Sequence, residues 1–206
     1  LANNDVVGAK STLASATKVA EYAPQSQVQI AILQLSANNL AGAAYNLEKS
    51  LSGQPDYLPA MALMAEVELR QGDPAKAEKR ARDIIAKNPG RAVGYSLVGD
   101  IAQARGQGTA AVDAYRKAHQ AEPSTETFAR LFTAMARQDN GKGVLALAEQ
   151  WLKNHPKDLV AQKLVANQYA RTGNNAQAKA AYEAALKLAP DDGEVLNNLA
   201  NILLRT

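Results

Sequence analysis

The sequence predicts an all-α fold built from a repeated pair of helices. Five prolines recur along the chain at almost constant spacings of 34, 34, 33 and 34: Pro55, Pro89, Pro123, Pro156 and Pro190. Small residues keep the same period, with glycines at one fixed offset before three of these prolines and alanines at another: Gly72, Gly106, Gly173, Ala77, Ala111 and Ala178. A fixed period of this length is typical of a stacked repeat array. Function is therefore expected on a surface that the stack creates.

The composition excludes several classes of function. The 206 residues include 23 basic and 20 acidic side chains, a net charge of +3, and no cysteine. So balanced a charge, without a basic run, argues against nucleic-acid binding, and without cysteine there is no disulfide or thiolate chemistry. No apolar run reaches about 18 residues, the length of a membrane-spanning segment. One mixed-charge cluster is interpreted as a solvated helix face rather than an anion site: Lys76, Glu78, Lys79, Arg80, Arg82 and Asp83.

Local signals indicate where helices start and stop. In the run 72–74, Gly72 ends one helix, Asp73 caps the next and Pro74 occupies its first turn. Asp191 and Glu194 have capping-box spacing at a later helix start. Each of the five periodic prolines is expected to stop the preceding helix, because the residue before a proline is pushed out of the helical region.

The repeat resembles the tetratricopeptide repeat, a helix–turn–helix unit of about 34 residues. With the proline at position 32, this family places apolar residues at 4 and 7, small residues at 8, 20 and 27, and aromatics at 11 and 24. The units that start at positions 159, 92 and 58 match in register: Val165, Ala166, Tyr169, Ala178, Tyr182, Ala185 and Pro190; Tyr95, Val98, Gly99, Ala111, Tyr115, Ala118 and Pro123; Met61, Met64, Ala65, Ala77, Ala81 and Pro89. The resemblance implies an α-α superhelix, a right-handed solenoid of about twelve antiparallel helices.

In this register, residues 1–206 form a single solenoid, which is interpreted as a fragment of a longer array. Residues 1–23 are expected to be the second helix of a partial repeat and residues 193–206 the first helix of a truncated one. Full repeats are predicted at 24–57, 58–91, 92–125, 126–158 and 159–192. Stacking is needed because no single repeat buries its apolar stripe alone. Apolar faces at the ends would also allow an artificial homodimer.

The repeat 126–158 departs from the pattern because it is one residue short. It places Phe132 and Thr133 at positions 7 and 8, and Trp151 at position 27, where a small residue is expected. Trp151 is interpreted as core packing that fills the altered space. The alternative is a partly exposed anchor at a bend between repeats.

No constellation of residues predicts catalysis. The two histidines, His119 and His155, fall near the ends of second helices, where the helix dipole favours a cation. Neither has the companions of a metal site. The run 140–143 lacks the rest of a phosphate-binding loop and is interpreted as a turn, and the acidic run 190–194 is too short for a calcium loop. The sequence therefore predicts a non-enzyme, without metal or cofactor, that binds a partner protein or peptide.

The family resemblance also implies which side chains face the concave groove formed by the first helices. The predicted groove residues are Glu66, Arg70, Asp100, Gln103, Arg130, Arg137, Lys163, Asn167, Arg171, Asn197, Asn198 and Asn201. The earlier members include two acids, whereas the later ones are mainly Arg, Lys and Asn. Because Arg holds carboxylates with paired hydrogen bonds and Asn can hold a peptide backbone, an acidic segment is predicted to bind the later half. The alternative is that these are ordinary solvated side chains.

Three of these residues have the spacing of part of the carboxylate clamp found in chaperone-binding members of the family. Lys163, Asn167 and Asn198 match the part of the clamp that holds a peptide C-terminus. The final basic pair of the clamp would lie beyond Thr206. Because Asn is common at these positions in the family, an ordinary polar groove is the alternative interpretation.

A closer resemblance rests on the Ala- and Leu-rich character of the repeats, seen in the runs 1–5, 151–156 and 193–200. They are similar to bacterial repeat lipoproteins found with exopolysaccharide and exosortase (PEP-CTERM) loci. That implies a periplasmic or outer-membrane-tethered scaffold for polysaccharide export or surface-protein sorting, with its lipidated cysteine upstream. Without this resemblance a cytoplasmic location is expected. The alternative function is a carbohydrate- or polymer-handling scaffold that uses Asn, Gln and Tyr side chains.

Overall fold

The computed structural model describes residues 8, 11–12, 23–138 and 142–204. These residues form α-helices and no strand, which confirms the predicted fold class. Most of the helix that the sequence predicts near the N-terminus lies outside the described residues. So does the first half of the predicted turn at 140–143, whose second half belongs to a helix.

The chain divides into two compact units, which are described separately: unit 1 (Leu1–Pro89) and unit 2 (Gly90–Thr206). The described part of unit 1 contains α2 (Pro24–Ser36), α3 (Leu40–Gly53), α4 (Leu58–Arg70) and α5 (Pro74–Lys87). The described part of unit 2 contains α6 (Ala92–Ala104), α7 (Gly108–Ala121), α8 (Thr125–Gln138), α9 (Lys142–Asn154), α10 (Leu159–Arg171), α11 (Asn175–Leu188) and α12 (Gly193–Leu203).

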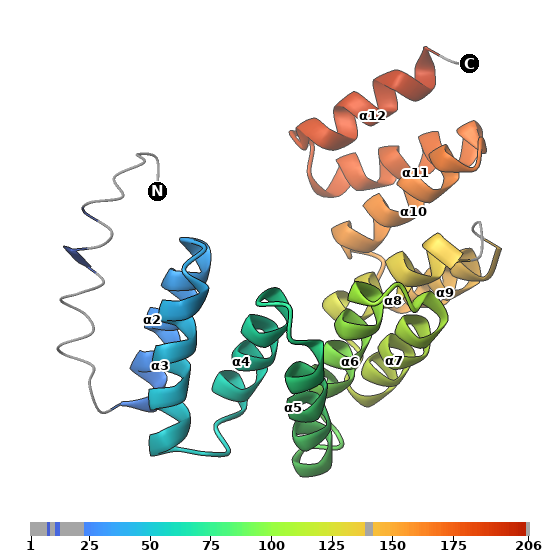
Figure 1. Ribbon diagram of the computed structural model, residues 1–206. Coiled ribbons are helices and arrows are strands. Elements are labelled where there is room, and N and C mark those ends of the chain that lie inside the picture. Colours follow the sequence, from blue (N-terminus) through green and yellow to red (C-terminus); the bar gives the residue numbers. More distant parts are fainter. Residues whose placement is uncertain (1–7, 9–10, 13–22, 139–141, 205–206) are drawn as a thin grey trace. The chain divides into compact units, whose positions relative to one another are not determined.

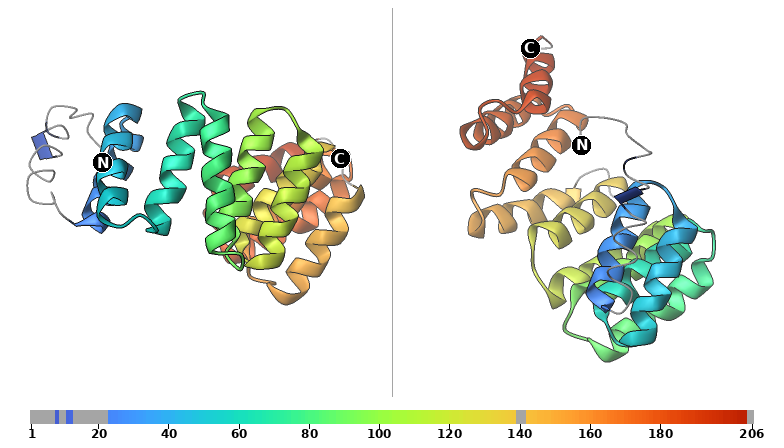
Figure 2. Two further views of the ribbon diagram at one scale, coloured as in Figure 1. Left: turned by 60° about the horizontal axis from the view of Figure 1, so that its bottom comes forward. Right: turned by 90° about the vertical axis from the view of Figure 1, so that its left-hand side faces the viewer.

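Consecutive helices pair as antiparallel hairpins (Figure 1). The pairs are α2 with α3, α4 with α5, α6 with α7, α8 with α9, and α10 with α11 (Figures 1 and 2). Within each unit, the second helix of one hairpin also packs against the first helix of the next, as α7 does against α8 and α11 against α12. The apolar stripe of each hairpin is thus covered by its neighbours in the unit.

The turn inside a hairpin needs one residue in the left-handed region. Gly72 has a φ of +83°, and its amide donates to Leu69 O (3.0 Å) while the next amide donates to Glu68 O (2.9 Å). This is the expected way to end a helix on glycine. Asn38 takes the same role in the α2–α3 turn, with a φ of +56°. Asparagine tolerates this conformation better than other residues with a side chain.

Aspartates cap several helices by accepting a hydrogen bond from a first-turn amide. Asp73 Oδ1 accepts from Lys76 N (3.1 Å), and Pro74 follows it at the first helical position, as the sequence predicts. The prediction that Asp191 caps α12 is wrong, because Asp192 occupies that position and accepts from Val195 N (3.1 Å). The helix starts one residue later than the capping-box spacing implied.

The periodic prolines stop the second helices as predicted. The helices α3, α5, α7, α9 and α11 end at residues 53, 87, 121, 154 and 188, in each case two residues before the proline. The first helix of the short repeat, α8, begins at Thr125, one residue before the predicted start of that repeat. Its start is fixed by Ser124, whose Oγ accepts from Thr127 N in the first turn (3.2 Å).

Small residues allow the two helices of a hairpin to approach closely. Alanines at positions 8, 20 and 27 are fully buried, for example Ala65, Ala77, Ala111, Ala166, Ala178 and Ala185. Gly99 shows why the size matters, since a Cβ built on it would overlap the Tyr115 ring. The close contact of α6 with α7 therefore requires a glycine opposite this tyrosine.

The α8–α9 hairpin is packed differently, with aromatic side chains in its core. Trp151 is 7% exposed and its ring stacks on Phe128, with centroids 5.2 Å apart. Its indole Nε1 donates to Asp158 Oδ2 (2.8 Å), so the polar edge of the ring is satisfied. The interpretation of Trp151 as core packing is confirmed, and the exposed-anchor alternative is wrong.

Within the described residues, no helix is both long and apolar enough to cross a membrane. Three leucines of the C-terminal segment are exposed on the described surface of unit 2: Leu196, Leu203 and Leu204. A homodimer formed through such apolar side chains stays a prediction.

Candidate functional site

The predicted groove residues lie on the first helices of hairpins in both units. In unit 1, α4 carries Glu66 and Arg70, whose side chains are 3.6 Å apart. Arg70 Nη2 also donates to Asn38 Oδ1 (3.0 Å). The other ten lie in unit 2, on α6, α8, α10 and α12: Asp100, Gln103, Arg130, Arg137, Lys163, Asn167, Arg171, Asn197, Asn198 and Asn201.

Tyrosines from second helices hold two of the groove side chains in place. Tyr115 Oη donates to Asp100 Oδ1 (2.6 Å), and Tyr182 Oη donates to Asn167 Oδ1 (2.6 Å). Burial, together with the bond to Asp100, raises the pKa of Tyr115 well above its ordinary value. Both phenols therefore stay protonated as donors and fix the orientation of a groove residue.

Arg130, predicted to attract an acidic ligand, is already paired within the chain. Its Nη1 donates to Asp100 Oδ1 (2.6 Å), and its Nε donates to Glu126 Oε1 (3.2 Å). Burial opposes the charge of Arg130, but the two carboxylates outweigh it and raise its pKa. Arg130 therefore joins α6 to α8 rather than presenting a free cation.

The residues proposed as a carboxylate clamp also meet carboxylates and amides of this chain. Lys163 Nζ lies 2.9 Å from Asp192 Oδ2 and 2.5 Å from Glu194 Oε2, and hydrogen bonds to both raise its pKa. Asn198 Nδ2 donates to Asn167 Oδ1 (3.3 Å). The structure thus brings the predicted clamp residues to neighbouring positions on α10 and α12. Lys163 is therefore paired with carboxylates of its own chain.

Arg171 is held by uncharged acceptors. Its Nη2 donates to the backbone oxygen of Ala136 on α8 (2.8 Å) and to Gln168 Oε1 (3.0 Å), and its Nε also donates to Gln168 Oε1 (3.2 Å). Among the described residues, the partners of this guanidinium are thus an amide side chain and a backbone carbonyl, and none is a carboxylate. Arg171 therefore keeps its positive charge in a fixed place between α8 and α10.

A cavity of about 240 Å³ lies beside Arg171, between α8 and α10. This α8–α10 cavity is lined by Phe132, Thr133, Ala136, Arg137, Leu164, Asn167, Gln168 and Arg171. Its floor is apolar because Phe132, Ala136 and Leu164 belong to or pack against the core of these helices. Its polar wall carries two guanidinium groups and side-chain amides. An apolar side chain with a polar or acidic neighbour fits such a lining.

A second cavity, of about 190 Å³, adjoins α8 on its other side. This α6–α8 cavity is lined by Gln103, Gly106, Gly108, Ala111, Ala134, Arg137 and Gln138. Arg137 borders both cavities and is exposed. Among the residues that the structure describes, Arg137 has no ion-pair or hydrogen-bond partner. Four predicted groove residues, Gln103, Arg137, Asn167 and Arg171, are thus brought together around two cavities.

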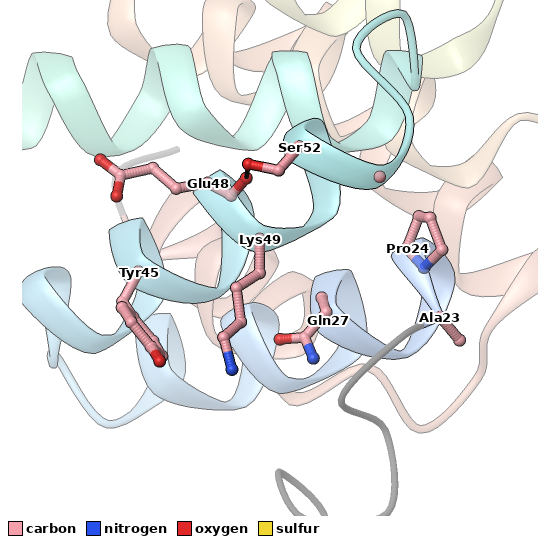
Figure 3. Close-up of a pocket in the computed structure, with 8 residues that line it drawn as sticks. Ala23, Pro24, Gln27, Tyr45, Glu48, Lys49 and Ser52 are labelled. Carbon is pink, nitrogen blue, oxygen red and sulfur yellow. Dashed lines mark hydrogen bonds between the residues drawn. The ribbon is translucent and has the colours of Figure 1, made fainter.

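Unit 1 has two larger hollows, one on either side of α3. The α2–α3 hollow measures about 520 Å³ and is shown in Figure 3, where Tyr45 and Lys49 point to one side of α3 and Glu48 to the other. Lys49 Nζ lies 4.9 Å from the centre of the Tyr45 ring, a cation–π arrangement. The other hollow, about 630 Å³, lies between α3, α4 and α5.

One of the basic residues interpreted as a solvated face contributes instead to the core of unit 1. Arg80 makes three hydrogen bonds to the Glu68 carboxylate, between 2.6 and 3.2 Å, and the Glu68 side chain is only 9% exposed. Sequence reasoning missed this pair because it treated Arg80 as one of a mixed cluster. The available signal was the glutamate twelve residues earlier, on the packed face of α4.

The two histidines contact the edge of the aromatic core of α7, α8 and α9, where His119 is half-buried and His155 is exposed. His155 stacks on Trp151 with centroids 3.8 Å apart, and His119 lies 5.2 Å from the same ring. Within the described part of the chain, no group of three His, Cys, Asp or Glu side chains could hold a metal ion. Their role here is packing, to which the bond between His119 Nδ1 and Thr127 Oγ1 (3.0 Å) contributes.

The family comparisons agree with the repeat pattern. Two models described as tetratricopeptide repeat match residues 34–101 and 159–202. A curated relative, the DnaJ homolog subfamily C member 7 homolog of Schizosaccharomyces pombe, is 27% identical over 177 residues. The match covers 82% of this chain and 33% of that protein, so the chain spans about a third of the relative's length.

Solved structures show the same fold at low sequence identity. Yeast Tom70 has a TM-score of 0.81 and 15% identity, and the match covers 98% of this chain and 44% of Tom70. YrrB, a TPR protein with an unusual peptide-binding site, has a TM-score of 0.56 and 16% identity, with coverage of 90% and 96%. These likenesses establish the arrangement of helices and do not carry over a ligand.

Proposed function

The chain is built from tetratricopeptide repeats, and we propose that it is a non-catalytic scaffold that binds a polypeptide segment of a partner protein. Proteins of this repeat generally serve as interaction scaffolds, and YrrB carries a peptide-binding site. The proposed site is the surface around the α8–α10 and α6–α8 cavities of unit 2.

The observation that carries the proposal is the position of Arg137. It is the side chain shared by both cavities, it is exposed, and no described residue neutralises it. Arg130 and Lys163, in contrast, are engaged by the chain's own carboxylates. The sequence predicts that an acidic segment binds along the whole later half of the groove. The proposed binding region for acidic groups is smaller and lies around Arg137 and Arg171.

The neighbouring groups suit a peptide. The apolar floor formed by Phe132 and Leu164 can accept an apolar side chain. Asn167 Oδ1 is occupied by Tyr182 and Asn198, so its amide nitrogen remains to donate to a peptide carbonyl. Arg137 can then hold an acidic group of the same segment with two hydrogen bonds.

The test is retention of a partner by immobilised protein from envelope and cytoplasmic fractions of the source cell. Arg137→Ala is compared with Arg116→Ala, a matched control because Arg116 is an exposed arginine on α7, paired with Asp113. We expect the partner to bind wild type and control equally and the Arg137 variant at least about tenfold more weakly, which corresponds to about 1.4 kcal/mol. Binding should also weaken with salt. Equal retention by all three proteins would place the binding surface elsewhere.

We further propose, from the texture of the sequence, that the partner belongs to exopolysaccharide export or surface-protein sorting in a bacterial envelope. Such a partner implies that the protein is periplasmic or tethered to a membrane. Fractionation of cells that express the full-length protein would test this location. A purified polysaccharide that binds with the same affinity in high salt, and equally to the Arg137 variant, would favour a polymer-handling scaffold instead.

A further inference from the structure

A buried side-chain amide, that of Gln168, lines the α8–α10 cavity. The residue is 3% exposed, and its Oε1 accepts two hydrogen bonds from Arg171, one from Nη2 (3.0 Å) and one from Nε (3.2 Å). Its Nε2 is buried, and no described residue accepts a hydrogen bond from it. The oxygen of this amide is thus satisfied within the chain, whereas the nitrogen is not.

Arg171 determines which end of the amide is the nitrogen. A guanidinium has N–H donors and no acceptor, so the atom of Gln168 that faces it has to be the oxygen. Turning the amide over would place its N–H donors against those of the guanidinium. The unpartnered atom of Gln168 is therefore a hydrogen-bond donor.

The same position of two other repeats is apolar. Val67 and Ile101 occupy it in the repeats 58–91 and 92–125, and they are 0% and 2% exposed. A buried donor without a partner destabilises a fold, so packing accounts for a valine or an isoleucine at this position. The contact with Arg171 accounts for the oxygen of Gln168. Neither accounts for its nitrogen.

We propose that Gln168 selects the group that enters the α8–α10 cavity: its Nε2 donates to a side-chain carboxylate of the bound polypeptide segment. The inference rests on the proposed function and names the chemistry of that segment. A carboxylate has two oxygens, so one can accept from Gln168 and the other from Arg137, which lines the same cavity. The apolar stem of a glutamate suits the floor formed by Phe132 and Leu164.

The lining of the cavity favours an acid over other side chains. Arg137 and Arg171 both line it, and none of its described lining residues is acidic. A basic side chain would add donors to a wall that already has an unpaired donor. An apolar side chain would cover Nε2 of Gln168 without satisfying it, which weakens binding. A neutral amide would accept from Gln168 but leave the charge of Arg137 unmatched.

The test begins with random heptapeptides on beads, selected with the whole wild-type chain. We expect the selected sequences to share an acidic residue. One such peptide is labelled with fluorescein, and its Kd is measured by fluorescence anisotropy. Gln168→Glu keeps an oxygen for Arg171 and replaces the donor by an acceptor of the same size, so it should bind at least about tenfold more weakly. Gln168→Met has no donor and adds no charge, and it should also lose affinity.

The outcomes separate this inference from the proposed function. Arg116→Ala is the control and should bind like wild type, and circular dichroism checks that every variant keeps its helices. If both Gln168 variants bind like wild type while Arg137→Ala binds more weakly, the proposed function stands and the role of Gln168 is wrong. Selected peptides without an acidic residue would also overturn the inference. A library that yields no binder would contradict both.

A measurement on the wild type avoids any variant that fails to fold. The side-chain amide signals of Gln168 are recorded in a proton–nitrogen correlation spectrum, without and with the selected peptide. A hydrogen bond to a carboxylate should move one of the two Nε2 proton signals downfield. The same peptide with its acidic residue changed to leucine should not move it. A signal that stays constant when the selected peptide binds would show that Nε2 meets no ligand oxygen, and would overturn the inference.

Discussion

The hairpins of unit 1 and unit 2 are locked by two different polar contacts. In unit 1, side chains twelve residues apart join the helices: Asn46 to Gln34 (2.8 Å) and Arg80 to Glu68. In unit 2, tyrosines join residues fifteen apart: Tyr115 to Asp100 and Tyr182 to Asn167. The same repeat architecture therefore joins the polar side chains of packed helices in two different ways.

The difference has a functional consequence. In unit 2, the side chains that accept the tyrosine hydrogen bonds are Asp100 and Asn167, which are predicted groove residues. The packing of the second helices therefore orients the proposed binding surface. The locks of unit 1 end on Gln34 and Glu68, which are not in that set. Preorganisation by a supporting shell is what a binding site requires, and unit 2 has it.

The α8–α9 hairpin differs from both, because a large and a small side chain have exchanged positions in its core. Ala148 is small where an aromatic is expected and Trp151 is large where an alanine is expected. Substitution of Trp151 by alanine should lower the free energy of unfolding by about 3–5 kcal/mol, because the lost indole leaves a cavity among its aromatic neighbours. Urea denaturation measures this. Trp151→Phe is the control and should cost less; a loss below about 1 kcal/mol for the alanine variant would show that the hairpin is not held by the indole.

Removing the arginine of the unit 1 lock should have the next largest effect. Arg80→Ala leaves the buried Glu68 carboxylate without its partner, and we expect a loss of about 2–3 kcal/mol, reduced from the fully buried case because Arg80 is 26% exposed. The double variant Glu68→Leu with Arg80→Met should recover most of that loss, as an apolar pair of similar size needs no charge compensation. Failure of the double variant to recover would mean that the pair itself stabilises unit 1.

The tyrosine lock of unit 2 can be tested through its glycine. Gly99→Ala places a methyl group against the Tyr115 ring, so we expect a loss of about 1–3 kcal/mol from overpacking. In a variant that also carries Tyr115→Leu, the same substitution should cost much less. Thermal unfolding of the four proteins gives the coupling between the two sites. Equal costs in both backgrounds would contradict a close contact of ring and glycine.

The smallest expected effect is the pH dependence from Asp158. Burial opposes its ionisation, but hydrogen bonds from Thr125, Trp151 and the amide of Ala161 outweigh burial and lower its pKa. This stabilisation is present above the carboxyl's unfolded pKa of about 3.9 and is lost as the pH falls through the lower folded value. The wild type should therefore lose up to about 1 kcal/mol more than Asp158→Asn below about pH 4. Parallel stability curves for the two proteins would be inconsistent with this assignment.

Much of the fold could be predicted because its determinants are local or periodic. Proline positions predicted where five helices end, and Gly72 and Asp73 predicted a helix stop and a cap. The expectation that Trp151 is buried followed from position alone. The cap at Asp192 was missed by one residue because two adjacent aspartates compete for one role, and only the backbone geometry distinguishes them.

The candidate site was predicted less completely. Position in the repeat identified the helices and listed Arg130, Arg137, Lys163 and Arg171 as equivalent cations. It did not identify the tyrosines that orient Asp100 and Asn167, although the spacing of fifteen between a tyrosine and a polar residue in two repeats was available in the sequence. The apolar floor beside them was not predicted, because the repeat pattern placed Phe132 only at position 7 and gave no prediction for Leu164.

The repeat period and the turn residues were enough to establish the all-α repeat, because they act through local backbone preferences. Tertiary contacts alone determine which charged side chains remain available to bind a partner. Lys163 meets Asp192 at a separation of 29 residues and Arg130 meets Asp100 at 30, whereas Arg137 meets no carboxylate among the described residues. Such pairs depend on how one hairpin lies against the next over a few ångströms. The sequence pattern defines a helix face and leaves open which carboxylate that face meets.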